Sequence, residues 1–347
     1  MPIIQNLIAE EFGTHIGKYQ GRLKITRQKE VLAQAPLLHL ESVTIVSSGV
    51  SISAEAIRAC TERGIPIHFI DNRGSPYASL YSAGLTGTVL TRRAQLTAYH
   101  DVRAIQLGAA WAGGKIENQA NLLLYSAKYR KDKNPALYQE LRLLALEIRD
   151  HLAELDGWRQ TAVHDQSHIE EVRGQLFSIE GRAAHKYWQG IQLLLPEDLG
   201  WPGRRGRGAK DPFNSALNYG YGILYGQIER AMVLAGLDPY GGYIHVDRPG
   251  KPSLVLDFIE PFRTPVVDRT LLGLVNNRVA IDQDERGQLT EKTRYQLADK
   301  ILQRLESATK YDDKRYALRT IIQMQARQLA TFVRGEREGY EPFVASW

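Results

Sequence analysis

The chain has 347 residues, of which 44 are Lys or Arg and 39 are Asp or Glu, so its formal net charge is +5. Hydrophobic residues make up 43% and charged residues 24%, an ordinary globular composition that excludes a disordered chain, a collagen and a coiled-coil rod. A chain of this length usually folds as two domains. The mild positive charge is compatible with a nucleic-acid partner but does not require one.

Cysteine content and hydropathy set the expected cellular context. The single cysteine, Cys60, cannot form an internal disulfide, which favours a reducing cytoplasm. No neighbouring base activates it, so we expect it to pack. The N-terminus lacks a basic stretch followed by a long apolar segment, so no signal peptide is expected. No run of roughly 18 apolar residues occurs, so we expect no membrane-spanning segment.

The first ninety residues have the pattern of β-strands. Two short runs at 14–19 and 22–26 flank Gln20 and Gly21, which predicts a hairpin. Apolar, β-branched segments predict further strands at 37–40, 43–46, 65–70 and 77–81. One helix is expected at 53–63, ended by Gly64. Residues 82–88, with two glycines, are the expected linker.

From residue 91 onward the apolar residues recur at spacings of three and four, which predicts helices. A long helix is expected at 213–236, where Gly236 and a following Pro239 mark its end. Further helical patterns lie at 122–125, 138–148, 169–188, 298–305 and 316–332. The stretch 199–210 has the composition of a loop.

Glu180 is the first candidate for a functional residue. In its predicted helix it shares a face with Leu176 and Ala183, so its carboxylate points toward apolar or small neighbours. A buried carboxylate costs several kcal/mol unless it is paired or bound to a metal. Either a salt bridge to Arg182 or Lys186, or a metal site, would satisfy it.

A second acidic segment follows a loop histidine. His245 precedes a Pro-Gly turn, and a helix with Ser253 as its expected N-cap comes next. Asp257 and Glu260 face the same way within this apolar helix. Pro261 cannot donate to the Asp257 carbonyl, so that oxygen is left free or the helix is kinked.

These two acids have two interpretations. They either form ion pairs with Arg263 or Arg269, or they join Glu180 and His245 in a metal site. A carboxylate-rich site suits Mg²⁺ or Mn²⁺, and a single imidazole favours Mn²⁺. Arg263, one turn after Glu260, is placed to neutralise a phosphate at such a site.

Two other patterns carry weaker indications. His164 and His168 have the spacing of a zinc-binding helix but lack the Glu that a metalloprotease motif places after the first His, so we expect surface residues. A glycine-rich basic loop suits phosphate contact, and a merely solvated loop is the alternative. Its cationic residues are Arg204, Arg205, Arg207 and Lys210.

Four blocks in order give the chain a strong resemblance to the CRISPR adaptation integrases, the metal-dependent endonucleases of spacer acquisition. They cover nearly the whole chain, and the last is the most specific. The blocks are 67–71 with Gly74; 115–119 with 122–124; 179–184 with Tyr187 and Trp188; and the set 211–214, 236–239, 242–245 and 256–263, followed by 266–269.

The resemblance implies an α+β fold, with an N-terminal β-sandwich domain at 1–86 for assembly and a larger all-α catalytic domain at 91–347. It implies a catalytic metal site of Glu180, His245 and Glu260, with Asp257 beside it and Arg263 as a basic residue near the active centre. The implied partners are double-stranded DNA (protospacer and CRISPR repeat), a second copy of the chain and a small ferredoxin-like adaptation protein. Pro261 departs from the family, which often has an acid there.

The residues themselves agree with phosphodiester chemistry, because a carboxylate-rich divalent site beside an arginine suits it. Two other functions remain open: a metal-dependent hydrolase of a small phosphorylated substrate, and a non-catalytic DNA-binding scaffold. Three tyrosines either line the DNA path or pack, and packing is the expectation. They are Tyr187, Tyr219 and Tyr221.

Overall fold

The structure is a computed structural model, and it describes residues 4, 6–46, 48–71, 74–81, 89–206 and 208–347. The expected linker at 82–88 and Arg207 of the basic loop lie outside the described residues. The chain forms two compact units. The first comprises Met1–Thr86, Gly206–Gly226 and Ala280–Leu302, and the second comprises Gly87–Arg205, Gln227–Val279 and Gln303–Trp347. Two later segments therefore pack with the first 86 residues.

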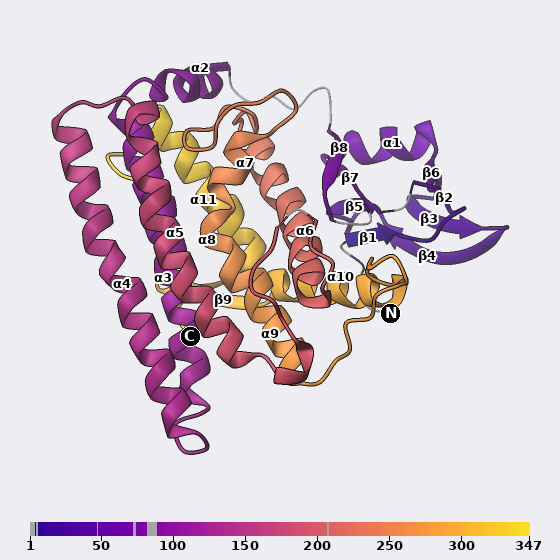
Figure 1. The fold of residues 1–347 in the computed structure, drawn as a ribbon. Helices are drawn as coiled ribbons and strands as arrows, with labels where there is room; N and C mark the ends of the chain where they lie inside the picture. Colours follow the sequence, from indigo (N-terminus) through magenta and orange to yellow (C-terminus); the bar gives the residue numbers. More distant parts are fainter. Residues whose placement is uncertain (1–3, 5, 47, 72–73, 82–88, 207) are drawn as a thin grey trace. The chain divides into compact units, whose positions relative to one another are not determined.

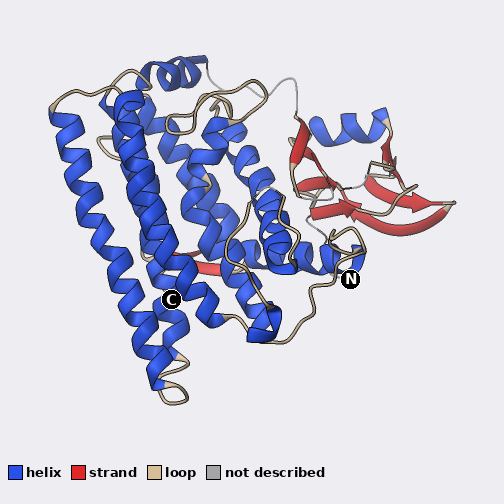
Figure 2. Ribbon diagram, viewed as in Figure 1, coloured by secondary structure: helices blue, strands red, loops and turns tan. Residues whose placement is uncertain are grey.

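The first unit contains two four-stranded sheets around one apolar core, which confirms the expected N-terminal β domain (Figure 2). One sheet has the order β1 (Asn6–Ala9), β5 (Ser42–Ile45), β7 (Ile67–Ile70), β8 (Pro76–Leu80). The other has the order β4 (Glu30–Pro36), β3 (Arg22–Arg27), β2 (His15–Tyr19), β6 (Ser51–Ile52). Strands β1, β5 and β7 are parallel, and the β2–β3 hairpin is antiparallel as predicted. Helix α1 (Ala54–Thr61) covers the core with its Cys60 side.

One predicted strand is wrong. Residues 37–39 form a turn after β4, in which Leu37 and Leu40 are buried but Leu38 is 86% exposed. The leucines made the segment look like a buried strand. A turn can also bury the first and last of these leucines without pairing to a neighbouring strand. Strands β1, β4 and β6 were not predicted. Strand β6 has only two residues, and β4 exposes the apolar side chains of Val31 and Leu32, so its sequence does not alternate between buried apolar and exposed polar residues.

The first half of α6 (Pro212–Leu234) belongs to the first unit. Two glycines, Gly74 and Gly222, allow it to approach the β domain closely. A Cβ on Gly74 would lie 2.4 Å from Tyr219 Cα, and one on Gly222 would lie 1.5 Å from Gly74 O. Gly74 also has φ +81°, a conformation that other residues rarely adopt. The turn before β8 thus packs backbone to backbone on α6.

The second unit is helical, with long helices α3 (Val102–Lys128), α4 (Pro135–His164) and α5 (Ile169–Leu194) lying side by side (Figure 1). The remaining helices are α2 (Val89–Ala98), α7 (Ser253–Phe258), α8 (Glu260–Arg263), α9 (Arg269–Asn276), α10 (Glu291–Glu306) and α11 (Leu318–Val333). Helix α10 ends in this unit. Among the helices that the structure describes, none is long and apolar enough to cross a membrane.

The second unit also contains a small antiparallel hairpin, β9 (Ala308–Tyr311) and β10 (Lys314–Ala317), so it is not purely helical. The sequence pattern placed a helix from 316, whereas α11 begins at Leu318. The hairpin turns at Asp312 and Asp313, both in left-handed conformation. Asp tolerates that conformation better than most residues, which explains how the tight turn forms without glycine.

Candidate functional site

Three helices bring an ammonium group and two carboxylates together. Lys115 comes from α3, Glu180 from α5 and Glu260 from α8. Lys115 Nζ donates a hydrogen bond to Glu180 Oε1 and lies 2.6 Å from Glu260 Oε2. The three side chains are 12–17% exposed. Helix packing therefore joins residues that are far apart in the sequence into one largely buried ionic group.

Glu180 does not form either salt bridge proposed from its own helix. Arg182 pairs with Glu154, and Lys186 pairs with Glu147 at 2.8 Å. Both cations lie on the side of α5 that meets α4, whereas Glu180 faces α3. Its partner is Lys115, which the sequence pattern included in a family block without assigning it a role.

Arg263 completes the ionic group, as its position one turn after Glu260 predicted. Its Nε lies 3.0 Å from Glu260 Oε1. Burial by itself raises the pKa of Glu260, but the charges of Arg263 and Lys115 outweigh it and lower that pKa to about 2. Burial likewise opposes the charge of Lys115, but Glu180 and Glu260 raise its pKa above the ordinary value. Glu260 is therefore ionised at neutral pH.

Asp257 holds His245 in place. It is fully buried, and its Oδ2 accepts hydrogen bonds from the amides of Tyr243 and Ile244 at 2.7 and 3.0 Å. Its Oδ1 accepts from the His245 amide at 2.9 Å and lies 2.6 Å from His245 Nδ1. Both carboxylate oxygens are thus engaged. A hydrogen bond to Nδ1 leaves Nε2 as the ring nitrogen available to a ligand.

Ser253 is not the N-cap of its helix, as the sequence pattern suggested, but the first residue of α7 after Pro252. Its hydroxyl accepts from Gly242 N at 3.0 Å and lies 2.7 Å from Asp247 Oδ1. The hydroxyl therefore ties the loop that carries His245 to α7. Helix α7 ends at Phe258 and α8 follows at Glu260, with Ile259 between them still in helical conformation.

The donor groups fit a divalent cation by their chemistry. Glu180 and Glu260 supply carboxylate oxygens, and His245 supplies an imidazole nitrogen. Glu260 Oε2 is buried, and it contacts the Lys115 ammonium at 2.6 Å. A cation, the Lys115 ammonium, already lies between the two carboxylates. Within the described ranges no three His, Cys, Asp or Glu side chains converge closely enough to hold a metal as they stand.

The other sequence candidates have structural roles. His164 is 88% exposed, as expected for a surface residue, whereas His168 is half-buried and caps α5, since its Nδ1 accepts from Glu170 N at 3.4 Å. Cys60 is fully buried, and burial raises its pKa to about 11, as expected for a packing residue. The three tyrosines pack, as expected: Tyr187 and Tyr219 are fully buried and Tyr221 is 8% exposed.

The basic loop divides between the two units. Arg204 lies over the Trp188 ring at 5.8 Å in the second unit, and Arg205 is exposed. Lys210 is exposed in the first unit. Arg269, the other expected partner of the acids, instead lies over the rings of Tyr125 and Trp347 at 4.8 and 4.7 Å.

The fold and site define a two-unit α+β protein with a buried group of acids, a lysine and an arginine beside a carboxylate-held histidine. Residues 7–310 match the family model described as CRISPR associated protein Cas1. The chain belongs to the Cas1 family, which confirms the resemblance seen in the sequence.

Two curated relatives are aligned over nearly their whole length. A CRISPR-associated endonuclease Cas1 of Archaeoglobus fulgidus is 38% identical, with 98% of this chain and 99% of the relative covered. Another, of Francisella tularensis subsp. novicida, is 32% identical, with 99% and 100% covered.

Solved structures show the same fold at lower identity. A casposase bound to an integration product has a TM-score of 0.79 at 20% identity, covering 97% of this chain and 93% of that one. A Cas1 protein of Thermotoga maritima has a TM-score of 0.74 at 19% identity, covering 99% of each chain. A chain of a Cas6-RT-Cas1–Cas2 complex has a TM-score of 0.74 at 21% identity, covering 99% of this chain and 37% of that one.

Proposed function

We propose that this protein is a divalent-metal-dependent DNA endonuclease and strand-transfer integrase that inserts spacer DNA into a CRISPR array. The observation that carries the proposal is the Lys115 ammonium between Glu180 and Glu260. Two carboxylates from different helices converge there on a cation, and the neighbouring Arg263 keeps Glu260 ionised. The family and the names of the curated relatives support the same reaction class.

In this proposal Glu180, Glu260 and the Nε2 of His245 hold Mg²⁺ or Mn²⁺, which when bound supplies Lewis-acid polarisation of a phosphate. Asp257 fixes the His245 ring and its tautomer instead of serving as a ligand, because both of its oxygens accept hydrogen bonds. Arg263 is placed beside Glu260 to offset negative charge on the reacting phosphate. Lys115 moves from between the carboxylates toward the same phosphate.

The reaction is a phosphoryl transfer from one oxygen to another. A DNA 3′-hydroxyl attacks a repeat phosphodiester, a new P–O bond forms, and the bond to the leaving 3′-oxygen breaks. No covalent enzyme intermediate is required, which agrees with the burial of Tyr187 and Tyr219 and their packing roles. When water attacks in place of the hydroxyl, the same arrangement gives endonuclease cleavage.

The proposed partners are double-stranded DNA, a second copy of the chain and a small ferredoxin-like adaptation protein. Arg204, Arg205, Arg207 and Lys210 supply cationic side chains for the DNA backbone, as we expected from the sequence. The unit built on the first 86 residues serves assembly. It exposes apolar side chains that a partner surface would cover, at Phe12, Tyr19, Val31, Leu32 and Leu38.

A strand-transfer assay on a supercoiled plasmid with a CRISPR repeat tests the proposal. We expect integration of a labelled duplex with Mn²⁺ or Mg²⁺ and the adaptation partner present, and none with EDTA. DNA binding that persists in EDTA, with no joining under any condition, would identify a scaffold instead. Metal-dependent hydrolysis of mononucleotides without any DNA activity would identify a small-substrate hydrolase.

A further inference from the structure

Asn118 of α3 makes three buried hydrogen bonds to backbone groups of two other segments. Its Nδ2 donates to Pro261 O at 2.7 Å and to Phe343 O at 2.9 Å, and its Oδ1 accepts from Ala345 N at 2.7 Å. The side chain has no exposed surface. One amide therefore joins α3, α8 and the C-terminal strap, which we define as residues 340–347.

A second proline follows Pro261 by four residues, at the start of the π-helix Thr264–Asp268. In an α-helix the carbonyl of residue i accepts from the N–H of residue i+4. For Pro261 that residue is Pro265, which has no N–H. A buried carbonyl without a partner costs about 1–3 kcal/mol. The α-helical i+4 bond to Pro261 O is therefore absent, the chain widens into a π-helix, and Asn118 supplies a buried side-chain donor to this carbonyl.

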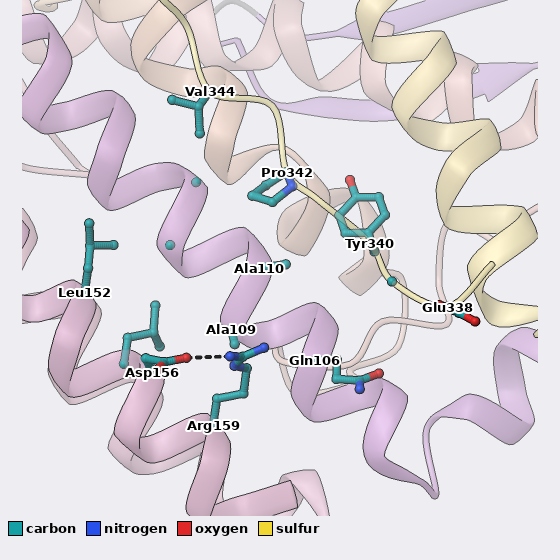
Figure 3. A pocket seen from close by; sticks show the side chains of 14 residues that line it. Gln106, Ala109, Ala110, Leu152, Asp156, Arg159, Glu338, Tyr340, Pro342 and Val344 are labelled. Atoms are coloured by element: carbon teal, nitrogen blue, oxygen red, sulfur yellow. Dashed lines mark hydrogen bonds and ion pairs between the residues drawn. The ribbon is translucent and has the colours of Figure 1, made fainter. Parts of the chain in front are cut away.

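The C-terminal strap also packs against the segment that contains Pro261 and Phe262. The Phe343 ring stacks on Phe262 with centroids 5.4 Å apart and an interplanar angle of 9°. A Cβ on Gly114 would lie 2.7 Å from Pro342 Cβ and 3.2 Å from Pro261 Cγ, so the missing side chain lets both prolines approach α3. Figure 3 shows Pro342 and Tyr340 on the strap beside α3, at a cavity of about 440 Å³ that none of the site residues lines. The family match ends at residue 310, before the strap.

We propose that Asn118 is a positioning residue for Glu260, acting through the Pro261 carbonyl and the C-terminal strap. The inference rests on the proposed function, because it assigns Asn118 to the geometry of that reaction. Glu260 directly precedes Pro261, so a shift of this carbonyl moves the Glu260 carboxylate relative to Lys115 and Glu180. Misplacement of a reacting group by about 1 Å can cost roughly 100-fold in rate.

Asn118→Asp tests this directly. It keeps the size and the acceptor for Ala345 N but places an oxygen against Pro261 O in place of a donor. We expect kcat for strand transfer to fall about tenfold or more, KM for DNA to stay within twofold, and Mn²⁺ affinity of the DNA-free protein to fall about tenfold. Asn121→Ala is the control. It removes a similar bond to the strap, Asn121 Nδ2 to Ala345 O at 3.2 Å, without touching α8, and should stay within twofold on all three measures.

A glycine pair on α3 provides a second test if the Asp variant folds poorly. Gly114→Ala should wedge Pro342 and Pro261 away from α3 and produce the same fall in kcat and Mn²⁺ affinity. Gly113→Ala adds the same methyl group one residue earlier, where it meets only Leu155 Cδ2 at 3.5 Å and Leu152 Cδ2 at 4.0 Å, and should leave both unchanged.

Hydrogen exchange of the metal-free protein separates this inference from the proposed function. Amides at 260–268 should exchange faster in Asn118→Asp and Gly114→Ala than in their controls. Unchanged exchange there, or kcat and Mn²⁺ affinity within twofold of wild type in both variants, overturns the positioning role. A wild-type protein that binds no Mn²⁺ would overturn the proposed function, while the exchange result still decides the role of Asn118.

Discussion

Two glutamates with little exposure, one in each unit, have pKa values shifted in opposite directions, although burial raises the pKa of both. Glu10, 8% exposed, has its pKa raised to about 7 by burial, which Arg294 and a long hydrogen bond from Tyr219 only partly offset. Glu260 has its pKa lowered to about 2, because Arg263 and Lys115 outweigh the same effect of burial. Burial alone favours a neutral carboxyl group, whereas contact with two cations keeps a carboxylate charged and able to bind a divalent metal.

The largest effect should come from removing the charge of Glu260. Glu260→Gln keeps the shape but loses the carboxylate, and Lys115 and Arg263 are left with one anionic partner fewer. We expect strand transfer to fall at least about a thousandfold. Glu117→Gln is the matched control, since Glu117 lies on α3 and pairs with Arg149 at 2.5 Å, outside the site. Activity of the Glu260 variant near that of the control would contradict the assignment of Glu260 as a ligand.

A smaller loss should follow from changing the partner of His245. Asp257→Asn places an amide where three backbone N–H groups and His245 Nδ1 need an acceptor. We expect kcat and Mn²⁺ affinity to fall by about 10- to 100-fold, as for other residues that orient a metal-binding histidine. Asp247→Asn, which changes a contact of Ser253 in the same loop, is the control and should have little effect. Equal effects of the two substitutions would rule out a special role for Asp257.

Lys115→Met should affect stability most clearly, because it leaves Glu180 and Glu260 facing each other without their shared cation. We expect the metal-free protein to lose about 3 kcal/mol of stability, as in other broken buried ion pairs. Mn²⁺ should then raise the melting temperature more than in wild type, since the metal replaces the ammonium. Calorimetric melting with and without Mn²⁺ measures this, with Arg149→Met as control. The same Mn²⁺-induced shift in variant and wild type would show that ammonium and metal do not share a site.

The last effect is confined to high pH and concerns Glu10. Its folded-state pKa of about 7 exceeds the ordinary 4.5, so its contribution to stability is complete below pH 4.5 and is lost as the pH rises through 7. Glu10→Gln cannot ionise and should be more stable than wild type by about 3 kcal/mol at pH 8.5 and equal to it near pH 4. Denaturant unfolding at both pH values measures this. A constant difference across that range would show that folding does not shift the pKa of Glu10.

His245, Asp257 and Glu260 lie within sixteen positions of one another, and this spacing led to the prediction of a metal site, which stays a prediction. Pro261 has no N–H to donate, whatever surrounds it. The β2–β3 hairpin and α1 followed from short-range turn and capping signals. In each case the interaction that decides the outcome is local.

Other outcomes depend on contacts that the sequence does not display. Lys115 and Glu180 are 65 positions apart, and only the packing of α3 against α5 joins them. The strand predicted at 37–40 is wrong because Leu37 and Leu40, three positions apart, are buried at the two ends of a turn while Leu38 is exposed.

The sequence by itself determined the family and the α+β composition, because these depend on residue identity and short spacing. Only the tertiary structure decided which groups meet. It pairs Glu180 with Lys115 instead of its helix neighbours, turns both oxygens of Asp257 toward His245 and its neighbouring amides, and brings Asn118 to the Pro261 carbonyl. Side-chain pairing is set by which helix faces touch, and those contacts arise between segments distant in the chain.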